Sequence, residues 1–176
     1  MRTRSRSRCG STSGGAEAMA AREQRIDQIT LDEHSVVRRN ADIEHERAVA
    51  ISDLLDDNSF APVSGARGPF HVHLGIEENR LALDIRAADG TPLERVVLPL
   101  SPFRSIVKDY FLVCESYYNA VKTANPSRIE AIDMGRRGLH DEGSELLRER
   151  LAERVMVDFN TARRLFTLLC VLHIRG

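Results

Sequence analysis

The fold of this chain is decided by the stretch from Arg128 to His173, which reads RIEAIDMGRRGLHDEGSELLRERLAERVMVDFNTARRLFTLLCVLH. Apolar residues recur there at intervals of three and four, which is the spacing of amphipathic helices. The pattern predicts two consecutive helices, of which the second begins near Asp158. That second helix is apolar on nearly every side, so we expect the rest of the chain to enclose it.

Two polar residues interrupt the apolar face of the first of these helices. Arg136 and His140 are four residues apart, so they are neighbours on one side of the helix. One interpretation is a pocket that binds phosphate or a carboxylate. The alternative is structural: the arginine stem lies along apolar surface and its charged head pairs with an acidic side chain. In either case we expect one polar cluster, in the interior or in a cleft, with an acidic group or an anion beside it.

The same helix contains three glycines, Gly135, Gly138 and Gly143. Each costs about 1 kcal/mol relative to alanine in a helix interior. Their presence therefore indicates either a close approach of another segment or space left for a ligand.

Three further arginines are candidates for binding an anion. Arg47 lies near the edge of the apolar face of a helix predicted over residues 41–57. Arg163 and Arg164 lie near the start of the last helix, where the helix dipole favours negative charge. Asp158, at the cap of that helix, already supplies a negative charge, which weakens this second case.

Upstream of these helices, apolar residues alternate with polar ones as they do in strands. Strands are predicted over residues 25–31, 70–76, 80–87 and 93–100, with a loop over residues 58–69 and a third C-terminal helix starting at Ser101. Residues 93–100 are apolar on both faces, which favours a more central strand. The order predicts an α+β fold, in which a small antiparallel sheet (a strand, a helix, then a three-stranded meander) packs against three C-terminal helices.

The helix that starts at Ser101 has more apolar residues than one face needs. Phe111, Leu112 and Tyr118 lie off its main apolar stripe. They must be covered by another helix of this chain or by a second subunit. A homodimer is the commonest closed arrangement, so we expect a protein partner or a homo-oligomer.

His71 and His73 project from the same face of a predicted strand, and that spacing can supply two ligands to Zn²⁺. Two ligands are not enough, and a solvated sheet face explains the pair more simply. We therefore predict no metal and no cofactor. Cys9, Cys114 and Cys170 are far apart, which favours small buried thiols in a reducing cytosol over disulfides.

Charge is distributed unevenly along the 176 residues. Residues 1–25 contain six arginines and two glutamates, which give this segment a charge of +4. Because the whole chain has a net charge of −1, the remaining residues together carry about −5. An acidic body argues against a nucleic-acid-binding domain, although the basic tail could contact nucleic acid. We expect residues 1–22 to be a disordered Arg/Ser/Gly-rich tail and residues 23–176 to form a single domain. The longest apolar run, Leu165 to Ile174, is too short to cross a bilayer.

Four segments of the chain resemble one known family. They read RIDQITLDE, DIEHERAVAISDLLDDN, IDMGRRGLHDEGSELLRERL and DFNTARRLFTLLCVLH. They are similar to a proteobacterial family known as uncharacterised protein family two hundred and sixty-two, over about residues 25–175. The resemblance implies a bacterial cytosolic protein, and it brings no activity with it. The N-terminal tail departs from the family's pattern.

No familiar catalytic motif is present in the sequence, which lacks a P-loop, a dinucleotide fingerprint, a nucleophile elbow and an HExxH helix. We therefore favour a small cytosolic, non-enzymatic regulatory or protein-interaction domain. The alternative is an enzyme or sensor that binds a small anion, phosphate or carboxylate, through Arg136 and His140. A weaker alternative is a nucleic-acid contact through the basic tail.

Overall fold

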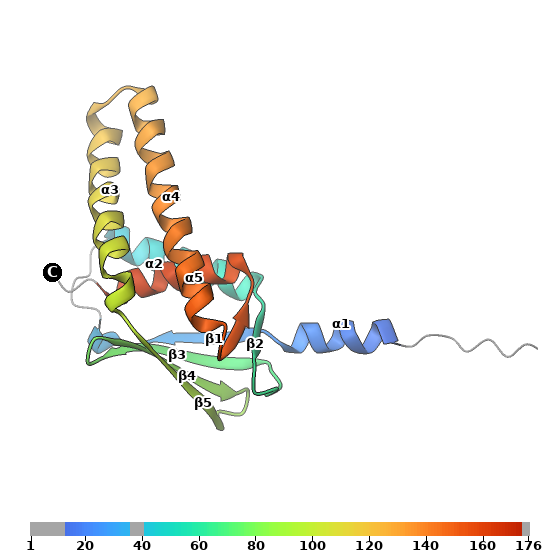
Figure 1. The fold of residues 1–176 in the computed structure, drawn as a ribbon. Helices are drawn as coiled ribbons and strands as arrows, with labels where there is room; N and C mark the ends of the chain where they lie inside the picture. Colours follow the sequence, from blue (N-terminus) through green and yellow to red (C-terminus); the bar gives the residue numbers. More distant parts are fainter. Residues whose placement is uncertain (1–12, 36–40, 174–176) are drawn as a thin grey trace, which may run out of the picture.

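A four-stranded sheet forms the base of the molecule (Figure 1) in the computed structural model, which describes residues 13–35 and 41–173. Its strands lie in the order β1 (Ile26–Leu31), β3 (Phe70–Glu77), β4 (Arg80–Ala87) and β5 (Pro92–Pro99). The last three form the antiparallel meander that the sequence predicts. β1 pairs parallel to β3, so the sheet is mixed rather than wholly antiparallel. The intervening helix returns the chain to the end at which β1 began, as parallel pairing requires.

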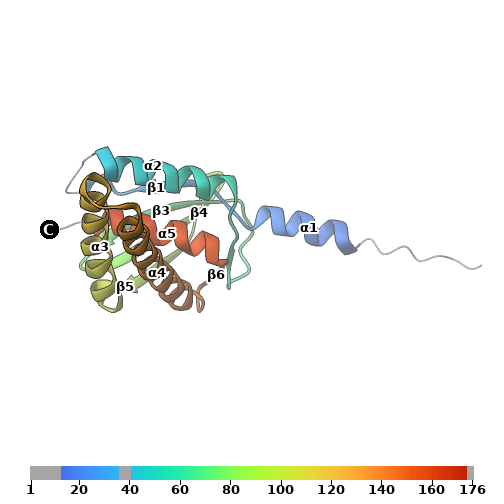
Figure 2. The same cartoon turned by 90° about the horizontal axis from the view of Figure 1, so that it is seen from above.

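Helices cover one face of this sheet. α2 (Ala41–Asp56) follows β1. The other three helices, α3 (Arg104–Thr123), α4 (Pro126–Leu151) and α5 (Phe159–Leu172), follow the meander. A short 3₁₀ turn, η2 (Ser101–Phe103), precedes α3. α5 lies between α2 and α4 (Figure 2). Its buried residues include Leu165, Phe166, Leu168, Leu169 and Leu172. The α+β class and the enclosed last helix are therefore confirmed.

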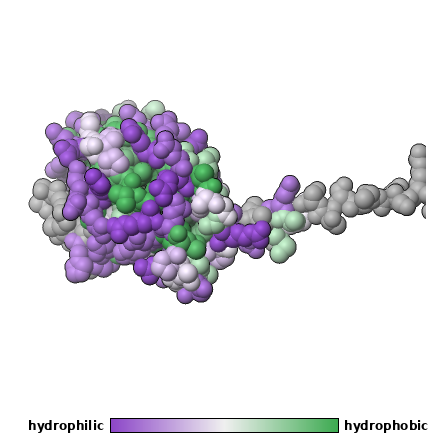
Figure 3. All heavy atoms as spheres, turned by 60° about the horizontal axis from the view of Figure 1, so that its bottom comes forward, coloured by the Kyte–Doolittle hydropathy of each residue, from purple (hydrophilic) through white to green (hydrophobic). Residues whose placement is uncertain are grey.

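The two faces of the sheet differ in burial because side chains alternate along each strand. Phe70, Val72 and Leu74 of β3 belong to the core beneath the helices, while His71 and His73 face the other way and are half-buried. Seen from this second side, the surface is mostly hydrophilic with small hydrophobic areas (Figure 3). β5 is an edge strand, so the prediction of a central strand was wrong. Its outward apolar residues, such as Val97, are simply exposed, as single apolar side chains often are.

Two short strands form a separate antiparallel pair, β2 (Phe60–Pro62) with β6 (Val155–Val157). The prediction of a loop over residues 58–69 was wrong for β2. Three residues are too few to show an alternation, and the buried Phe60 and Val155 reveal the pairing only once the chain has folded. β6 ends where Asp158 caps α5 by accepting a hydrogen bond from the backbone of Thr161, which confirms the predicted start of that helix.

α3 and α4 form an antiparallel hairpin that extends away from the sheet (Figure 1). Asn125 begins α4, because its side chain accepts a hydrogen bond from the backbone N–H of Arg128 at 2.9 Å. The half of α4 nearest the sheet packs on α5 through Gly143, Ser144, Leu147 and Leu151, which are all buried. The opposite half lies in the projecting part of the hairpin.

The N-terminal segment contains a helix, α1 (Ser13–Glu23), where the sequence analysis expects disorder through residue 22. The run of alanines in AEAMAAR favours a helix by intrinsic propensity, and residues 14–19 are exposed along it. α1 extends away from the sheet and helices (Figure 1). Residues 1–12, and with them Cys9, lie outside the described part of the chain. Within that part, no helix is both long enough and apolar enough to span a membrane.

Candidate anion-binding site

A pocket of about 280 Å³ opens between α2, α3, α4 and α5. Two helices supply its polar wall: α4 contributes Arg136, Arg137 and His140, and α5 contributes Arg163, Arg164 and Thr167. The remaining lining comes from α2, with His45, Glu46, Val49 and Ala50, and from Tyr110 of α3. Four of the five arginine and histidine positions that the sequence singles out for an anion therefore meet in one place.

Arg136 is held rigidly at the side of the pocket. Its Nη2 and Nε donate to Oδ1 of Asp133 at 2.6 and 3.1 Å, one turn earlier on α4. Its guanidinium carbon also lies 4.6 Å from the centre of the Tyr117 ring. The hydrogen bond from Arg136 lowers the pKa of Asp133, so this carboxyl group stays charged. The acidic partner that a half-buried arginine needs is therefore present.

The other three arginines of the pocket also pair with aspartates. The pairs are Arg137–Asp133 at 2.9 Å, Arg163–Asp141 at 3.4 Å and Arg164–Asp53 at 3.3 Å. None of these aspartates lines the pocket, so the carboxylates hold the arginines from outside it. The charged heads of these arginines are thus paired, and they also surround a pocket.

His140 is wedged between aromatic rings at the base of this cluster. Its ring centre lies 5.5 Å from that of Tyr110 and 5.2 Å from that of Phe166. Burial, reinforced by the positive charge of Arg163, lowers the pKa of His140 to about 4. The imidazole is therefore neutral at physiological pH.

The hydrogen bonds of His140 indicate which ring nitrogen carries the proton. Its Nε2 lies 2.8 Å from Oγ1 of Thr167, and that hydroxyl donates to the backbone carbonyl of Arg163 at 3.2 Å. We assign the proton of His140 to Nε2, as the donor to Oγ1, because the single hydroxyl proton of Thr167 is directed at that carbonyl. Ser144 donates its own proton to the carbonyl of His140 at 2.6 Å. The imidazole is thus fixed in one tautomer and one orientation.

Comparison with known proteins identifies the family. Residues 23–175 match the model of a family described as Uncharacterised protein family (UPF0262). The chain belongs to this family. The match confirms the resemblance found in the sequence, and it covers every element that builds the pocket.

Relatives in the UPF0262 family come from several bacteria. A UPF0262 protein of Rhodopseudomonas palustris is 63% identical over 148 residues, which are 84% of this chain and 91% of that protein. One from a Bradyrhizobium species is 62% identical over 156 residues, covering 88% and 93%. One from Paramagnetospirillum magneticum is 61% identical over 153 residues, covering 87% and 98%. No solved structure matches this chain.

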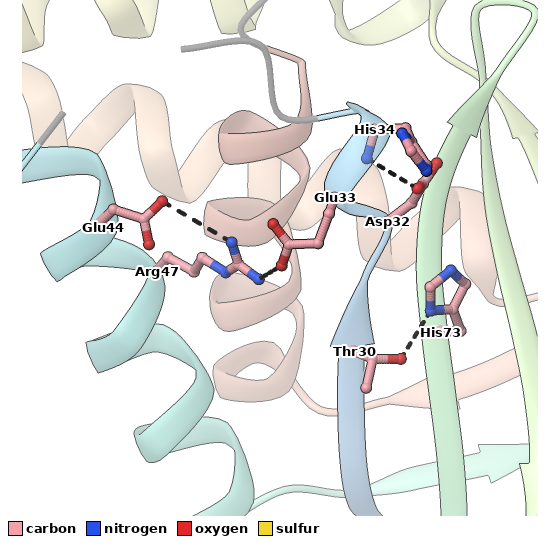
Figure 4. Close-up of polar contacts among 7 residues, drawn as sticks. All are labelled: Thr30, Asp32, Glu33, His34, Glu44, Arg47 and His73. Carbon is pink, nitrogen blue, oxygen red and sulfur yellow. Dashed lines mark hydrogen bonds and ion pairs between the residues drawn. The ribbon is translucent and has the colours of Figure 1, made fainter. Parts of the chain in front are cut away.

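Arg47 lies apart from the pocket, although it is on the same helix as four of the lining residues. Its guanidinium donates to Glu33 at 2.5 Å and lies 4.0 Å from Glu44 (Figure 4). Its side chain is only 16% exposed, and the hydrogen bond that it donates to Glu33 raises the pKa of Arg47. Arg47 therefore ties α2 to the segment after β1, and it does not join Arg136 and His140.

The histidine pair of β3 lies on the open face of the sheet. His73 Nδ1 is 2.7 Å from the hydroxyl of Thr30 on β1 (Figure 4). His71 lies opposite Arg86 of β4 in the strand register, which is an unsuitable neighbour for a cation. Among residues 13–35 and 41–173, no group of three or more His, Cys, Asp or Glu side chains is placed to hold a metal ion.

The three residues proposed for an interaction surface have different environments. Phe111 packs against the core and is half-buried, whereas Leu112 is 54% exposed. The hydroxyl of Tyr118 donates to Glu46 of α2 at 2.8 Å, beside the pocket. Tyr118 is nevertheless 37% exposed, so both Leu112 and Tyr118 are left partly uncovered by the described part of the chain.

Three parts of the pocket were not predicted from the sequence: Arg137, Tyr110 and the residues of α2. Arg137 adjoins Arg136 and could have been included on that ground alone. Tyr110 belongs to a regular apolar stripe, and nothing in that stripe distinguishes a pocket wall from core. The α2 residues reach the pocket only because α2 packs on α5, which is a contact between segments more than a hundred residues apart.

Proposed function

We propose that this protein is a small, non-enzymatic regulatory domain of the bacterial cytoplasm that binds an anion in the arginine-lined pocket. The observation that carries the proposal is the gathering of four arginines from two helices around one pocket. A guanidinium presents a planar fork of N–H donors that matches the oxygens of phosphate and carboxylate groups. Arginines gathered in this way favour a negatively charged ligand over a neutral or cationic one.

The charges on the lining residues support the proposal. Four guanidinium groups face one carboxylate, that of Glu46, while His140 is neutral. The ion pairs behind the arginines involve partly exposed groups and are typically worth about 0–1 kcal/mol each. They orient the guanidinium groups without using up all of their donors. An anion can therefore bind without first breaking a strong interaction.

Arg163 illustrates this incomplete satisfaction. Its Nε is buried and makes no hydrogen bond within the described part of the chain, although Asp141 Oδ1 lies 3.4 Å away. A buried donor without a hydrogen bond costs roughly 1–3 kcal/mol. An acceptor that reached this Nε would remove that cost.

Binding is favoured over catalysis by the state of His140. In a nucleophile–base pair the hydroxyl donates its proton to the imidazole. Here the hydroxyl of Thr167 donates to a backbone carbonyl, and it receives a hydrogen bond from His140. A histidine with a pKa of about 4 is also a weak base at neutral pH. The Thr167–His140 pair is thus arranged as a structural contact.

The position of the pocket suggests how anion binding could be signalled. It lies at the foot of the α3–α4 hairpin, and α4 itself contributes Arg136, Arg137 and His140. A ligand held by α4 and α5 together would restrict movement of the hairpin relative to the core. The hairpin carries exposed apolar residues, among them Leu112, Val121 and Met134. We propose that a protein partner or a second copy of the chain binds this projecting element.

Ligand-dependent thermal melts test the anion-binding function. Inorganic phosphate, sulfate and acetate are each added at constant ionic strength, with chloride as the reference. We expect at least one of the three to raise the melting temperature in a saturable manner, since a ligand that binds only the folded state stabilises it. Equal melting temperatures in all of these salts would contradict the proposal.

Two variants separate the pocket from general charge effects. Arg164→Met removes a pocket arginine that pairs with Asp53, and it should abolish most of the stabilisation by the anion. Arg148→Met is the matched control, because Arg148 pairs with Glu145 at 3.5 Å but does not line the pocket. The control should retain the full response of the wild type.

A further inference from the structure

We propose that the ligand of the pocket is a small organic phosphate monoester, bound as a dianion. This inference rests on the anion-binding function proposed above and specifies the class of ligand. It depends on three features of the pocket: the number of guanidinium groups, the net charge of the lining, and an apolar wall on α2.

The number of guanidinium groups exceeds what one carboxylate can use. A carboxylate has two oxygens, and a single arginine can bind both of them. A phosphate monoester presents three acceptor oxygens and carries nearly two negative charges at neutral pH. Arg137, Arg163 and Arg164 lie on two neighbouring helices and can approach one phosphoryl group from two sides.

The net charge of the lining leads to the same class. The four arginines and Glu46 give these five lining residues a formal charge of +3. Asp133, Asp141 and Asp53 offset this charge from behind the arginines, but they do not line the pocket. From the pocket side the arginines therefore attract a dianion more strongly than a monocarboxylate. Because the side chains are partly removed from water, each additional charge contributes more than it would in bulk solvent.

The organic part of the ligand is inferred from the α2 side of the pocket. Val49 is 42% exposed, Ala50 is buried, and Tyr110 of α3 also lines the pocket. These apolar groups would have no role with inorganic phosphate alone. A volume of about 280 Å³ lies just below the range of about 300–1,000 Å³ typical of small-molecule sites, so the organic part is small.

Glu46 gives the α2 wall of the pocket a negative charge, whereas the α4–α5 wall carries the arginines. Its carboxylate accepts a hydrogen bond from Tyr118 and lies on the same helix as Val49. It would repel a phosphoryl group placed against α2. The phosphoryl group therefore belongs at the α4–α5 wall, and the organic part belongs at the α2 wall.

Isothermal titration of the full-length protein with phenyl phosphate, benzoate and inorganic phosphate tests this assignment at pH 7.5 or above, where the monoester is a dianion. We expect phenyl phosphate to bind at least about tenfold more tightly than either of the other two, equivalent to about 1.4 kcal/mol. Val49→Ser should weaken the binding of phenyl phosphate more than that of inorganic phosphate, and so reduce the advantage of the monoester. Arg163→Met should weaken both phosphates.

The outcomes separate this inference from the function on which it rests. Benzoate binding as tightly as phenyl phosphate would overturn the phosphate class while the anion-binding function stands. Inorganic phosphate binding as tightly as phenyl phosphate would overturn the organic part. Binding of none of the three probes would overturn the inference, and together with unresponsive thermal melts it would overturn the proposed function as well.

Discussion

The ring of Phe166 on α5 lies against the backbone of Gly143 on α4 so closely that a Cβ atom at residue 143 would be 2.2 Å from its Cζ. The glycine thus allows the close approach of two helices that both line the pocket. Phe166 in turn contacts His140 edge-on, at an interplanar angle of 82°. The position of His140 therefore depends on the absence of a side chain one turn further along α4.

Gly143→Ala should destabilise the protein by about 1–3 kcal/mol, because a methyl group at that position forces Phe166 to move within a packed core. Gly138→Ala is the matched control on the same helix, where a Cβ would meet nothing within 4 Å. It should stabilise the protein by about 0.5–1 kcal/mol through the better helix propensity of alanine. Urea denaturation measures both, and effects of the same sign would contradict the packing described.

His140 should make the protein less stable as the pH falls from about 6.5 to about 4. Its pKa is about 4 in the folded state and 6.5 in the reference state, so the unfolded chain binds a proton first. Above pH 6.5 both states are neutral at this residue and it contributes no pH dependence. Below that value the wild type should lose up to about 3 kcal/mol relative to a His140→Gln variant.

The measurement is the difference in unfolding free energy between the wild type and His140→Gln at several pH values. Taking the difference removes the titration of the carboxyl groups and of His173, whose pKa is also lowered by burial. A difference that stays constant between pH 4 and 7 would show that His140 is not protonated on unfolding.

Arg136 and Asp133 should show a favourable coupling energy of about 0.5–1.5 kcal/mol in a double-mutant cycle. Arg136→Met alone leaves Asp133 with one remaining partner, Arg137 at 2.9 Å, so its cost should be modest. Adding Asp133→Asn removes the charge that has lost a partner and should recover most of that cost. Additive effects of the two substitutions would mean that the pair does not stabilise α4.

Leu112 should belong to a contact between two copies of the chain. We expect light scattering at high protein concentration to give the mass of a dimer, since burying an exposed leucine side chain is worth about 1.5–3 kcal/mol. Leu112→Lys should shift the mass to that of a monomer. Leu93→Lys, at an exposed position on the edge strand β5, is the control and should leave the mass unchanged. A monomeric wild type would contradict this prediction.

Local patterns account for most of what the sequence predicted correctly. β1 and α2 begin or end within a residue or two of the predicted bounds, because their apolar spacing is a property of the segment itself. Arg136 and His140 were found together for the same reason, since two residues four apart on a helix are neighbours whatever the tertiary structure is. The errors arise where the secondary structure depends on pairing between segments far apart in the chain, as it does for the strand pair β2–β6.

Arg47 shows where helical spacing ceases to be informative. It is within three residues of His45, Glu46, Val49 and Ala50, all of which line the pocket, yet it pairs with Glu33. The sequence places it near the edge of an apolar face. It does not say which neighbouring element that edge meets, because this depends on how α2 is rotated against α5.

The sequence by itself determined the α+β class, the bounds of α2, the start of α5 and the position of Arg136 and His140 on one side of α4. Those features depend on residues close together in the chain, whose geometry is set by the helical or extended backbone. Only the tertiary structure decided that α5 lies between α2 and α4, and so brought Arg163 and Arg164 to the same pocket. The physical reason is that the packing of the buried α5 depends on the shape of the whole core rather than on any one segment. The contact of Phe166 with Gly143 is part of that packing.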